Sequence, residues 1–190
     1  MQEEIEFVGF GKITRDNPFF VTITEKINGT NGCIVIKDGS IVKVQSRRRF
    51  ITPLDDNAGF AKWVYSNKEE LETMGDGNHF GEWAGPKIQK NPLNLVEKTF
   101  FLFNTTRWNE DNQNIPKCCC VVPVLFTGEL QPGSVSGWLD RLEDYASEGA
   151  TPEGIVIYYH AFNTYTKHTI IHPNGKWEEN GQFVHEGDKR

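Results

Sequence analysis

Three features are scarce in this chain of 190 residues: long apolar runs, an excess of positive charge, and cysteines at zinc-binding spacing. No apolar stretch is long enough to span a bilayer, and the first residues are acidic. We therefore expect neither a signal peptide nor a membrane anchor. Lys and Arg number 20 against 26 Asp and Glu, which gives a net charge of −6. A broadly basic surface is excluded, and any contact with nucleic acid must rest on a local patch.

Only four cysteines are present, Cys33 and the run at residues 118–120. Adjacent cysteines bridge poorly because the geometry is strained, and this spacing fits no zinc pattern. We expect all four to be reduced and to serve as small, buried apolar residues. Free thiols are typical of reducing compartments, so the protein is expected in the cytoplasm.

What the chain does have is the composition of an ordinary globular domain, with 37% hydrophobic and 24% charged residues. Apolar runs of strand length alternate with turn residues, and Pro123 favours a bulge or a sheet edge. The expected strands are residues 6–13, 19–23, 34–37, 41–50, 99–104, 118–126, 152–159 and 165–171. With two helices and no repeat or linker, this pattern predicts one α+β domain over residues 1–190.

Local signals mark the turns and the helix ends. Asp38-Gly39 between two apolar runs predicts a hairpin. The acidic and amide residues at 55–57 predict the start of a helix over residues 58–74, which Gly75 would end. Ser134 or Ser136 is expected to cap a second helix that runs through Ser147.

Three successive arginines, Arg47, Arg48 and Arg49, follow the second strand of that hairpin. On a strand they would point to alternate faces, with Arg47 and Arg49 sharing one face. Such a run is often a solvated edge that discourages aggregation. The functional interpretation is a phosphate contact.

Residues 24–32 are an unusual segment to find between two apolar strands, because they place Lys26 among short hydrogen-bonding residues and glycines. A lysine at the edge of a core can lose solvent, and the resulting fall in its pKa makes it nucleophilic. Taken alone, such a segment is more often a hairpin turn with a solvated lysine. Later segments of the chain change this assessment.

Four segments, in this order, resemble the nucleotidyltransferase motifs of polynucleotide ligases, and the longer stretches 25–31 and 80–89 resemble the RNA ligase 2 type in particular. The four segments are Lys-Ile-Asn-Gly at 26–29, Phe-Gly-Glu-Trp at 80–83, Phe-Phe-Leu-Phe at 100–103 and Glu-Gly-Ile-Val at 153–156. Asn28 stands where the wider superfamily has Asp, a position that the RNA ligase 2 branch leaves open. The resemblance covers most of the chain and implies an antiparallel-sheet adenylation domain.

The resemblance also implies the activity and its catalytic residues. The enzyme would be an ATP-dependent RNA ligase that uses Mg²⁺ or Mn²⁺ and seals 5′-phosphate and 3′-hydroxyl ends. Lys26 would attack the α-phosphorus of ATP to form lysyl-AMP, Lys167 would contact the α-phosphate, and Glu153 would hold the metal. Thr169 stands where the terminal motif has a second lysine, and Lys176 is a candidate substitute.

The remaining implied residues form the nucleotide site. The backbone at Glu25 and Ile27 would meet the adenine edge, and the Phe103 ring would stack on adenine. Asn31 would contact the nucleotide or the incoming phosphate, and Arg47 would contact phosphate or ribose. Glu82 would hold the ribose hydroxyls. Phe101 is assigned to the core, and the five histidines, which show no ligand spacing, receive no role.

Several alternatives share these motifs. A DNA ligase would use DNA ends, and an mRNA-capping guanylyltransferase would use GTP. A nucleotide-binding or nucleic-acid-binding module without catalysis is a third alternative, favoured by Thr169 and the negative charge. We expect RNA ends as partners, with DNA ends as the variant. No accessory C-terminal domain follows Lys167 in this sequence, so an accessory protein is expected to help hold the substrate.

Overall fold

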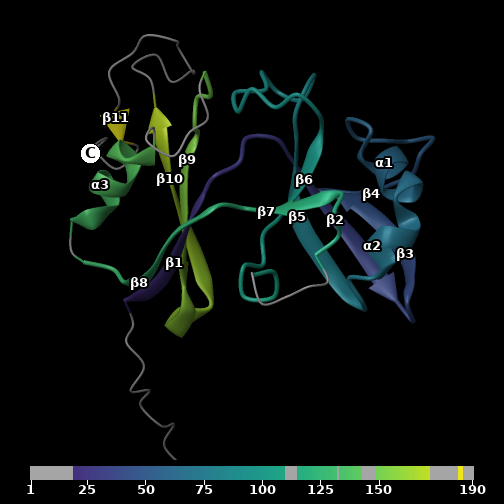
Figure 1. Cartoon of the computed structure of the whole chain (residues 1–190), viewed down its shortest axis with the longest axis horizontal. Helices are drawn as coiled ribbons and strands as arrows, with labels where there is room; N and C mark the ends of the chain where they lie inside the picture. Colours follow the sequence, from purple (N-terminus) through teal and green to yellow (C-terminus); the bar gives the residue numbers. More distant parts are fainter. Residues whose placement is uncertain (1–18, 110–114, 132, 143–148, 172–183, 186–190) are drawn as a thin grey trace, which may run out of the picture.

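The computed structural model describes residues 19–109, 115–131, 133–142, 149–171 and 184–185. Their strands form two sheets that lie side by side (Figure 1). The first has the order β11-β10-β9-β1-β8, and the second has the order β4-β3-β2-β5-β6-β7. Neighbouring strands are antiparallel except β6 and β7, which are parallel. The expected α+β class is confirmed. The expected first strand at residues 6–13 lies outside the described residues.

The first sheet contains β1 (Phe20–Glu25), β8 (Val124–Glu129), β9 (Gly154–Tyr159), β10 (Thr164–Ile171) and β11 (Val184–His185). The second contains β2 (Thr30–Lys37), β3 (Ser40–Ser46), β4 (Phe50–Ile51), β5 (Gly77–Ala84), β6 (Thr99–Leu102) and β7 (Cys119–Val121). Helix α3 (Ser134–Asp140) lies beside the first sheet, and α1 (Phe60–Ser66) and α2 (Lys68–Glu72) lie beside the second (Figure 1). Within the described ranges no helix is long and apolar enough to cross a membrane.

The hairpin between β2 and β3 is the one expected at Asp38-Gly39. Lys37 pairs with Ser40, and the two turn residues have φ of 52° and 73°. Positive φ at both positions is typical of a type I′ turn, which explains the preference for Asp and Gly. The Asp76 carboxylate accepts hydrogen bonds from both turn amides, at 3.0 and 2.9 Å.

The helix expected over residues 58–74 is broken in two at Asn67. The Asn67 amide donates to the Trp63 carbonyl at 2.8 Å, so the side chain competes with the helical backbone. The expected cap is partly confirmed. Gly59 occupies the N-cap position, while the Asp56 carboxylate accepts from the amides of Ala61 and Lys62 at 2.8 and 3.0 Å. Gly75 follows α2 with φ of 75°, as expected of a residue that ends a helix.

Two expectations about the helix and strand after residue 117 were wrong. The single strand expected over residues 118–126 is instead divided at residues 122–123 between β7 in the second sheet and β8 in the first; both are edge strands, so Pro123 does lie at a sheet edge. Gly133, rather than either serine, occupies the N-cap of α3; Ser134 and Ser136 instead donate to the carbonyls of Gln131 and Gly133. The stretch expected to continue that helix falls largely outside the described residues.

The core of the second sheet is aromatic. Phe60 packs against Phe100 with ring centroids 4.8 Å apart, and Trp63 packs against Trp83 at 4.9 Å. Such pairs add about 0.5–1.5 kcal/mol each beyond the area they bury. Gly32 in β2 makes room for this cluster, since a Cβ there would lie 2.5 Å from the Phe60 ring. The packing fixes β2 against β5, and that register positions the residues described next.

The cysteines are free, as expected. Cys33 and Cys119 are buried, and Cys118 is partly buried. Cys120 is exposed, so the expectation of burial was wrong for this residue. Successive side chains of β7 point to opposite faces of the sheet, which explains why Cys119 is buried and Cys120 is exposed.

Candidate active site

Lys26 lies where the chain crosses from one sheet to the other. Residues 26–29 connect β1 in the first sheet to β2 in the second (Figure 1). The backbone is fixed on entry, because the Glu25 amide donates to the Pro123 carbonyl at 2.9 Å and the Lys26 amide donates to the Gly154 carbonyl at 2.8 Å. The lysine is therefore not in a hairpin turn, and its position is determined by strands from distant parts of the sequence.

The Lys26 ammonium forms an ion pair with Glu153, with Nζ and Oε1 2.5 Å apart. Both side chains are largely buried, with 22% and 18% of their surfaces exposed. Glu153 immediately precedes β9, and its carbonyl accepts from the Ile170 amide at 2.9 Å. The structure thus brings together two residues that the sequence analysis assigned to nucleophile and metal ligand.

Gly154 explains how Glu153 reaches this position. Its φ is 150°, and a Cβ at residue 154 would lie 2.1 Å from the carbonyl oxygen of His168 on β10. A residue with a side chain would have to push β9 and β10 apart. The glycine of the Glu-Gly-Ile-Val segment is therefore needed for the close approach of the two strands.

Glu82 reaches the same region from the second sheet. It pairs with Asn31 across β2 and β5, and the Asn31 amide donates to Glu82 Oε2 at 2.8 Å. The pKa of Glu82 is raised to about 7, chiefly because the carboxyl group is buried; the charge of Lys26 and the hydrogen bonds from Gly29 and Asn31 lower it, and the Glu153 charge raises it. These contributions place Glu82 within electrostatic reach of the Lys26–Glu153 pair.

Two further residues of the expected adenine site lie on the same crossing segment. Glu25 is partly buried, and desolvation raises the pKa of its carboxyl group. The Ile27 side chain is buried against Ala84, Phe101 and Val122. Only the backbone of Ile27 is therefore available to a ligand, as the sequence analysis assumed.

Phe101 and Phe103 differ in burial, as expected. Phe101 is buried, in agreement with its assignment to the core. Phe103 is 41% exposed just beyond β6, where its amide donates to the Phe80 carbonyl at 3.0 Å. Because Phe101 pairs with Glu82, and Phe103 is two residues further on, Glu82 and Phe103 share one face of the sheet. An exposed ring therefore stands on the face that carries the acid.

Lys167 and Arg47 are not drawn into this cluster. Lys167 is exposed in β10, opposite Val156 in β9. Arg47 is exposed after the end of β3. Within the described ranges, neither side chain makes a hydrogen bond or ion pair with the other candidate site residues. Lys176, the candidate substitute for the missing second lysine, lies outside the described residues.

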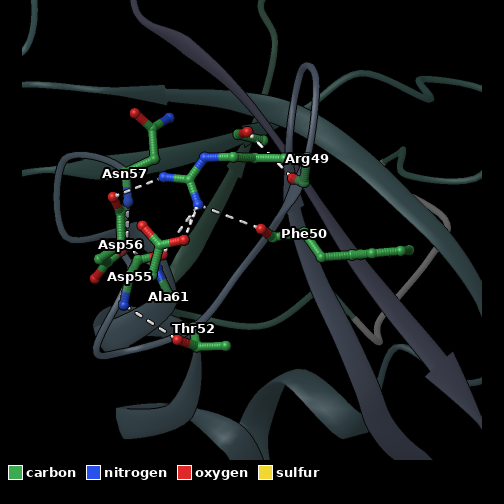
Figure 2. A network of polar contacts seen from close by, with 8 residues as sticks. Arg49, Phe50, Thr52, Asp55, Asp56, Asn57 and Ala61 are labelled. Carbon is green, nitrogen blue, oxygen red and sulfur yellow. Dashed lines mark hydrogen bonds and ion pairs between the residues drawn. The ribbon is translucent and has the colours of Figure 1, made fainter.

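The arginine run is not a strand, which corrects the expectation of alternating faces. Residues 47–49 form the bend between β3 and β4. Figure 2 shows the Arg49 guanidinium directed at the Asp55 carboxylate, with Nη1 2.5 Å from Oδ2, and reaching the Asp56 carbonyl. Arg49 therefore holds the loop that leads into α1. All three arginines are exposed, but only Arg49 is held by this ion pair.

Sequence reasoning missed two functional arrangements at this site. The hydrogen bond from Asn31 to Glu82 depends on the register of β2 and β5, which no local signal specifies. The role of Gly154 was also missed, although a glycine directly after an acidic site residue is a usable signal.

The family model described as RNA ligase matches residues 20–169, and the chain belongs to the RNA ligase family. No curated protein sequence matches the chain significantly.

Solved structures of a Naegleria gruberi RNA ligase are similar to the chain. A mutant with ATP and Mn is 21% identical, with a TM-score of 0.59, and the match covers 80% of this chain and 50% of that one. A mutant with AMP and Mn is 20% identical, with a TM-score of 0.58 and the same two coverages. The ligase with PPi is 19% identical, with a TM-score of 0.55, and covers 79% and 49%. The chain thus spans about half the length of these relatives.

Proposed function

We propose that this chain is the adenylation domain of an ATP-dependent RNA ligase, with Lys26 as the nucleophile. The observation that carries the proposal is the pairing of Lys26 with Glu153 beside the buried Glu82, at the crossing between the two sheets. Membership of the RNA ligase family supports the choice of reaction. The ATP, AMP and PPi in the structures of the Naegleria gruberi ligase support the choice of nucleotide.

The reaction proceeds in three transfers. The Lys26 amine attacks the α-phosphorus of ATP, a phosphorus–nitrogen bond forms, and pyrophosphate leaves. A 5′-phosphate oxygen then attacks the same phosphorus, which breaks that bond and returns the amine. Finally a 3′-hydroxyl attacks the 5′-phosphorus, the phosphodiester forms, and AMP leaves. Each transfer places negative charge on phosphate oxygens, and positioned cations stabilise it.

The protonation of Lys26 decides the first transfer. An ion pair with Glu153 requires an ammonium, whereas attack on phosphorus requires a neutral amine. The pair must therefore separate, and the amine must lose a proton, before the bond forms. Lys167, exposed on β10, supplies a further positive charge for the α-phosphate.

The other residues orient the nucleotide. Glu82 accepts hydrogen bonds from the ribose hydroxyls, with its carboxylate oriented by Asn31. The exposed ring of Phe103 stacks on adenine, the backbone at Glu25 and Ile27 meets its edge, and Arg47 contacts phosphate. These assignments follow from the resemblance of the motifs and from the exposure of each side chain.

Glu153 fits the role of a metal-binding carboxylate. Mg²⁺ is usually held by one or two carboxylates together with substrate phosphates and water, and Glu153 offers one such carboxylate beside the nucleophile. A bound Mg²⁺ or Mn²⁺ would neutralise charge on the phosphate oxygens.

We further propose that residues 1–190 form one domain, that the protein acts in the cytoplasm, and that an accessory protein or further segment helps to hold the RNA. The net charge of −6 motivates the last point, because a negative domain repels a polyanion at long range.

The test supplies pre-adenylated RNA and pre-adenylated DNA, together with separate labelling by ATP and GTP. An RNA ligase labels with ATP and seals RNA ends faster than DNA ends. Preference for DNA ends indicates a DNA ligase, and labelling by GTP indicates a capping enzyme. Nucleotide binding with neither labelling nor sealing indicates a module without catalysis, which would contradict the proposal.

A further inference from the structure

One face of the first sheet carries a row of contacting aromatic rings, here called the aromatic strip: Phe20, His160, Tyr158 and Tyr165. Ring centroids lie 5.3 Å apart between Phe20 and His160, 4.8 Å between His160 and Tyr158, and 5.1 Å between Tyr158 and Tyr165. Phe20 is 41% exposed and Tyr165 is 68% exposed. The strip is therefore a continuous ring surface that solvent reaches at both ends.

The strip lies on the face of the sheet opposite to α3. Val21 and Ile157 are fully buried in the cluster that includes Leu139 of α3. Residues adjacent along a strand point to opposite faces. Tyr158 pairs with Thr22 on β1 and with Tyr165 on β10, so these three side chains share the face that α3 does not cover.

Hydrogen bonds hold the strip in place. His160 Nε2 lies 2.9 Å from the hydroxyl of Thr22, which is 5% exposed beneath the rings. The Tyr158 hydroxyl donates to Asn163 Oδ1 at 3.0 Å. Rings fixed in this way lose little conformational freedom when a ligand covers them, which favours binding.

The strip begins next to Lys167, the cation assigned to the α-phosphate. Lys167 lies two residues from Tyr165 on β10, and a spacing of two places both side chains on one face, about 7 Å apart along the strand. Glu129 pairs with Phe20 at the other end and would repel phosphate there. The strip thus leads away from the cation assigned to the α-phosphate and ends beside an acid.

We propose that the aromatic strip stacks unpaired bases of the RNA strand whose end is sealed at Lys26. This rests on the proposed function and adds the mode of substrate binding. A chain with a net charge of −6 has no excess of positive charge to contribute to affinity, and aromatic stacking binds single strands of any sequence without further positive charge. Exposed aromatic residues on a sheet face are a common platform for unpaired RNA bases.

The test measures binding of single-stranded RNA by fluorescence anisotropy, without ATP, for wild type, Tyr165→Ala and Tyr165→Trp. Tyr65→Ala is the matched control, because Tyr65 is 42% exposed on α1, beside the other sheet. We expect Tyr165→Ala to weaken binding about 5- to 100-fold, the range for one lost stacking contact, and Tyr165→Trp and Tyr65→Ala to bind as wild type does. Thermal unfolding checks that each variant is folded.

A second oligomer, with abasic sites in place of bases, separates stacking from other contacts. Tyr165→Ala and wild type should bind it equally, since no base remains to stack. The proposal would be overturned if Tyr165→Ala weakened binding of both oligomers equally, or if Tyr165→Ala and Tyr65→Ala had equal affinity for normal RNA. Either result would indicate that the strip binds a protein partner instead. Because this assay needs no catalysis, its failure is distinct from a failure of the chain to label with ATP.

Discussion

Nζ of Lys26 lies 2.5 Å from Oε1 of Glu153, so the nucleophile of the proposed reaction is paired with the proposed metal ligand. The pair has two opposite effects on transfer. The contact with Glu153 must separate before Lys26 can attack, and it holds the Glu153 carboxylate where a metal ion that stabilises phosphate charge would bind. The larger of the two effects decides whether removal of Glu153 slows or speeds AMP transfer to Lys26.

Glu153→Ala should slow AMP transfer to Lys26. The substitution also leaves Lys26 without an ion-pair partner, in a pair whose side chains are only 22% and 18% exposed. Losing the carboxylate that would hold the metal ion would remove that ion's stabilisation of transition-state charge, a loss of about 10²–10³ in rate. Single-turnover labelling should therefore show a large net loss. Glu69→Gln, an exposed change on α2, is the control and should leave the rate unchanged. An unchanged rate in Glu153→Ala would show that this acid is structural.

Glu82 should make the protein less stable as pH rises. Its pKa of about 7 lies above the ordinary value of 4.5, so the folded state binds more protons between these values. Stability attributable to Glu82 is then present below about pH 4.5 and is lost as pH rises through about 7. One pKa unit corresponds to about 1.4 kcal/mol, so the loss is at most about 3.5 kcal/mol.

The check is urea unfolding of wild type and Glu82→Gln at pH 5 and pH 8. Glutamine keeps an oxygen for the Asn31 amide and does not ionise, so the difference in stability between the two pH values should be smaller in the variant. The same pH dependence in both proteins would mean that Glu82 has an ordinary pKa.

Gly154→Ala should destabilise the fold and impair transfer together. The new Cβ would lie 2.1 Å from the His168 carbonyl oxygen, so β9 and β10 must separate, at a cost of about 1–3 kcal/mol. Glu153 moves with them. Gly137→Ala in α3 is the matched control, because nothing lies within 4 Å of its Cβ and alanine favours a helix by about 0.5–1 kcal/mol. Urea unfolding that finds both variants at least as stable as wild type would contradict the strand geometry.

Arg47 and Arg49 should differ in their effect on RNA binding. Arg49 is engaged with Asp55 (Figure 2). Arg47 is exposed and is not part of that ion pair. Each phosphate contact with a single strand contributes about −0.7 to the slope of log K against log salt. Arg47→Gln should make the slope shallower by about that amount, and Arg49→Gln should leave it unchanged. A salt titration in which Arg49→Gln has the larger effect would assign the phosphate contact to Arg49 instead.

The parts of the fold that the sequence predicted are those set by local chemistry. The hairpin at Asp38-Gly39 and the strands β6 and β9 follow from turn residues and apolar runs. The wrong predictions involve partners that lie elsewhere. Arg49 leaves the strand pattern because Asp55 binds it, and Pro123 separates two sheets that no local signal distinguishes.

The same division holds for the site. Lys26, Glu82 and Glu153 were predicted because each lies in a segment that resembles a ligase motif. Their spatial arrangement was not predicted, because it depends on the register of β2 with β5 and on the close approach of β9 and β10 at Gly154. The aromatic strip went unnoticed because His160 shows no ligand spacing, and its ring contacts arise only when β1, β9 and β10 pair.

The central claim is that Lys26 becomes covalently attached to AMP. The most direct measurement is incubation of wild type and Lys26→Arg with α-labelled ATP and Mg²⁺, followed by denaturing electrophoresis. Arginine keeps the positive charge but does not deprotonate, so it provides no neutral nucleophile. We predict that label remains on the wild-type chain and is absent from a folded Lys26→Arg variant. Label on Lys26→Arg at the wild-type level, or none on the wild-type chain, would contradict the claim.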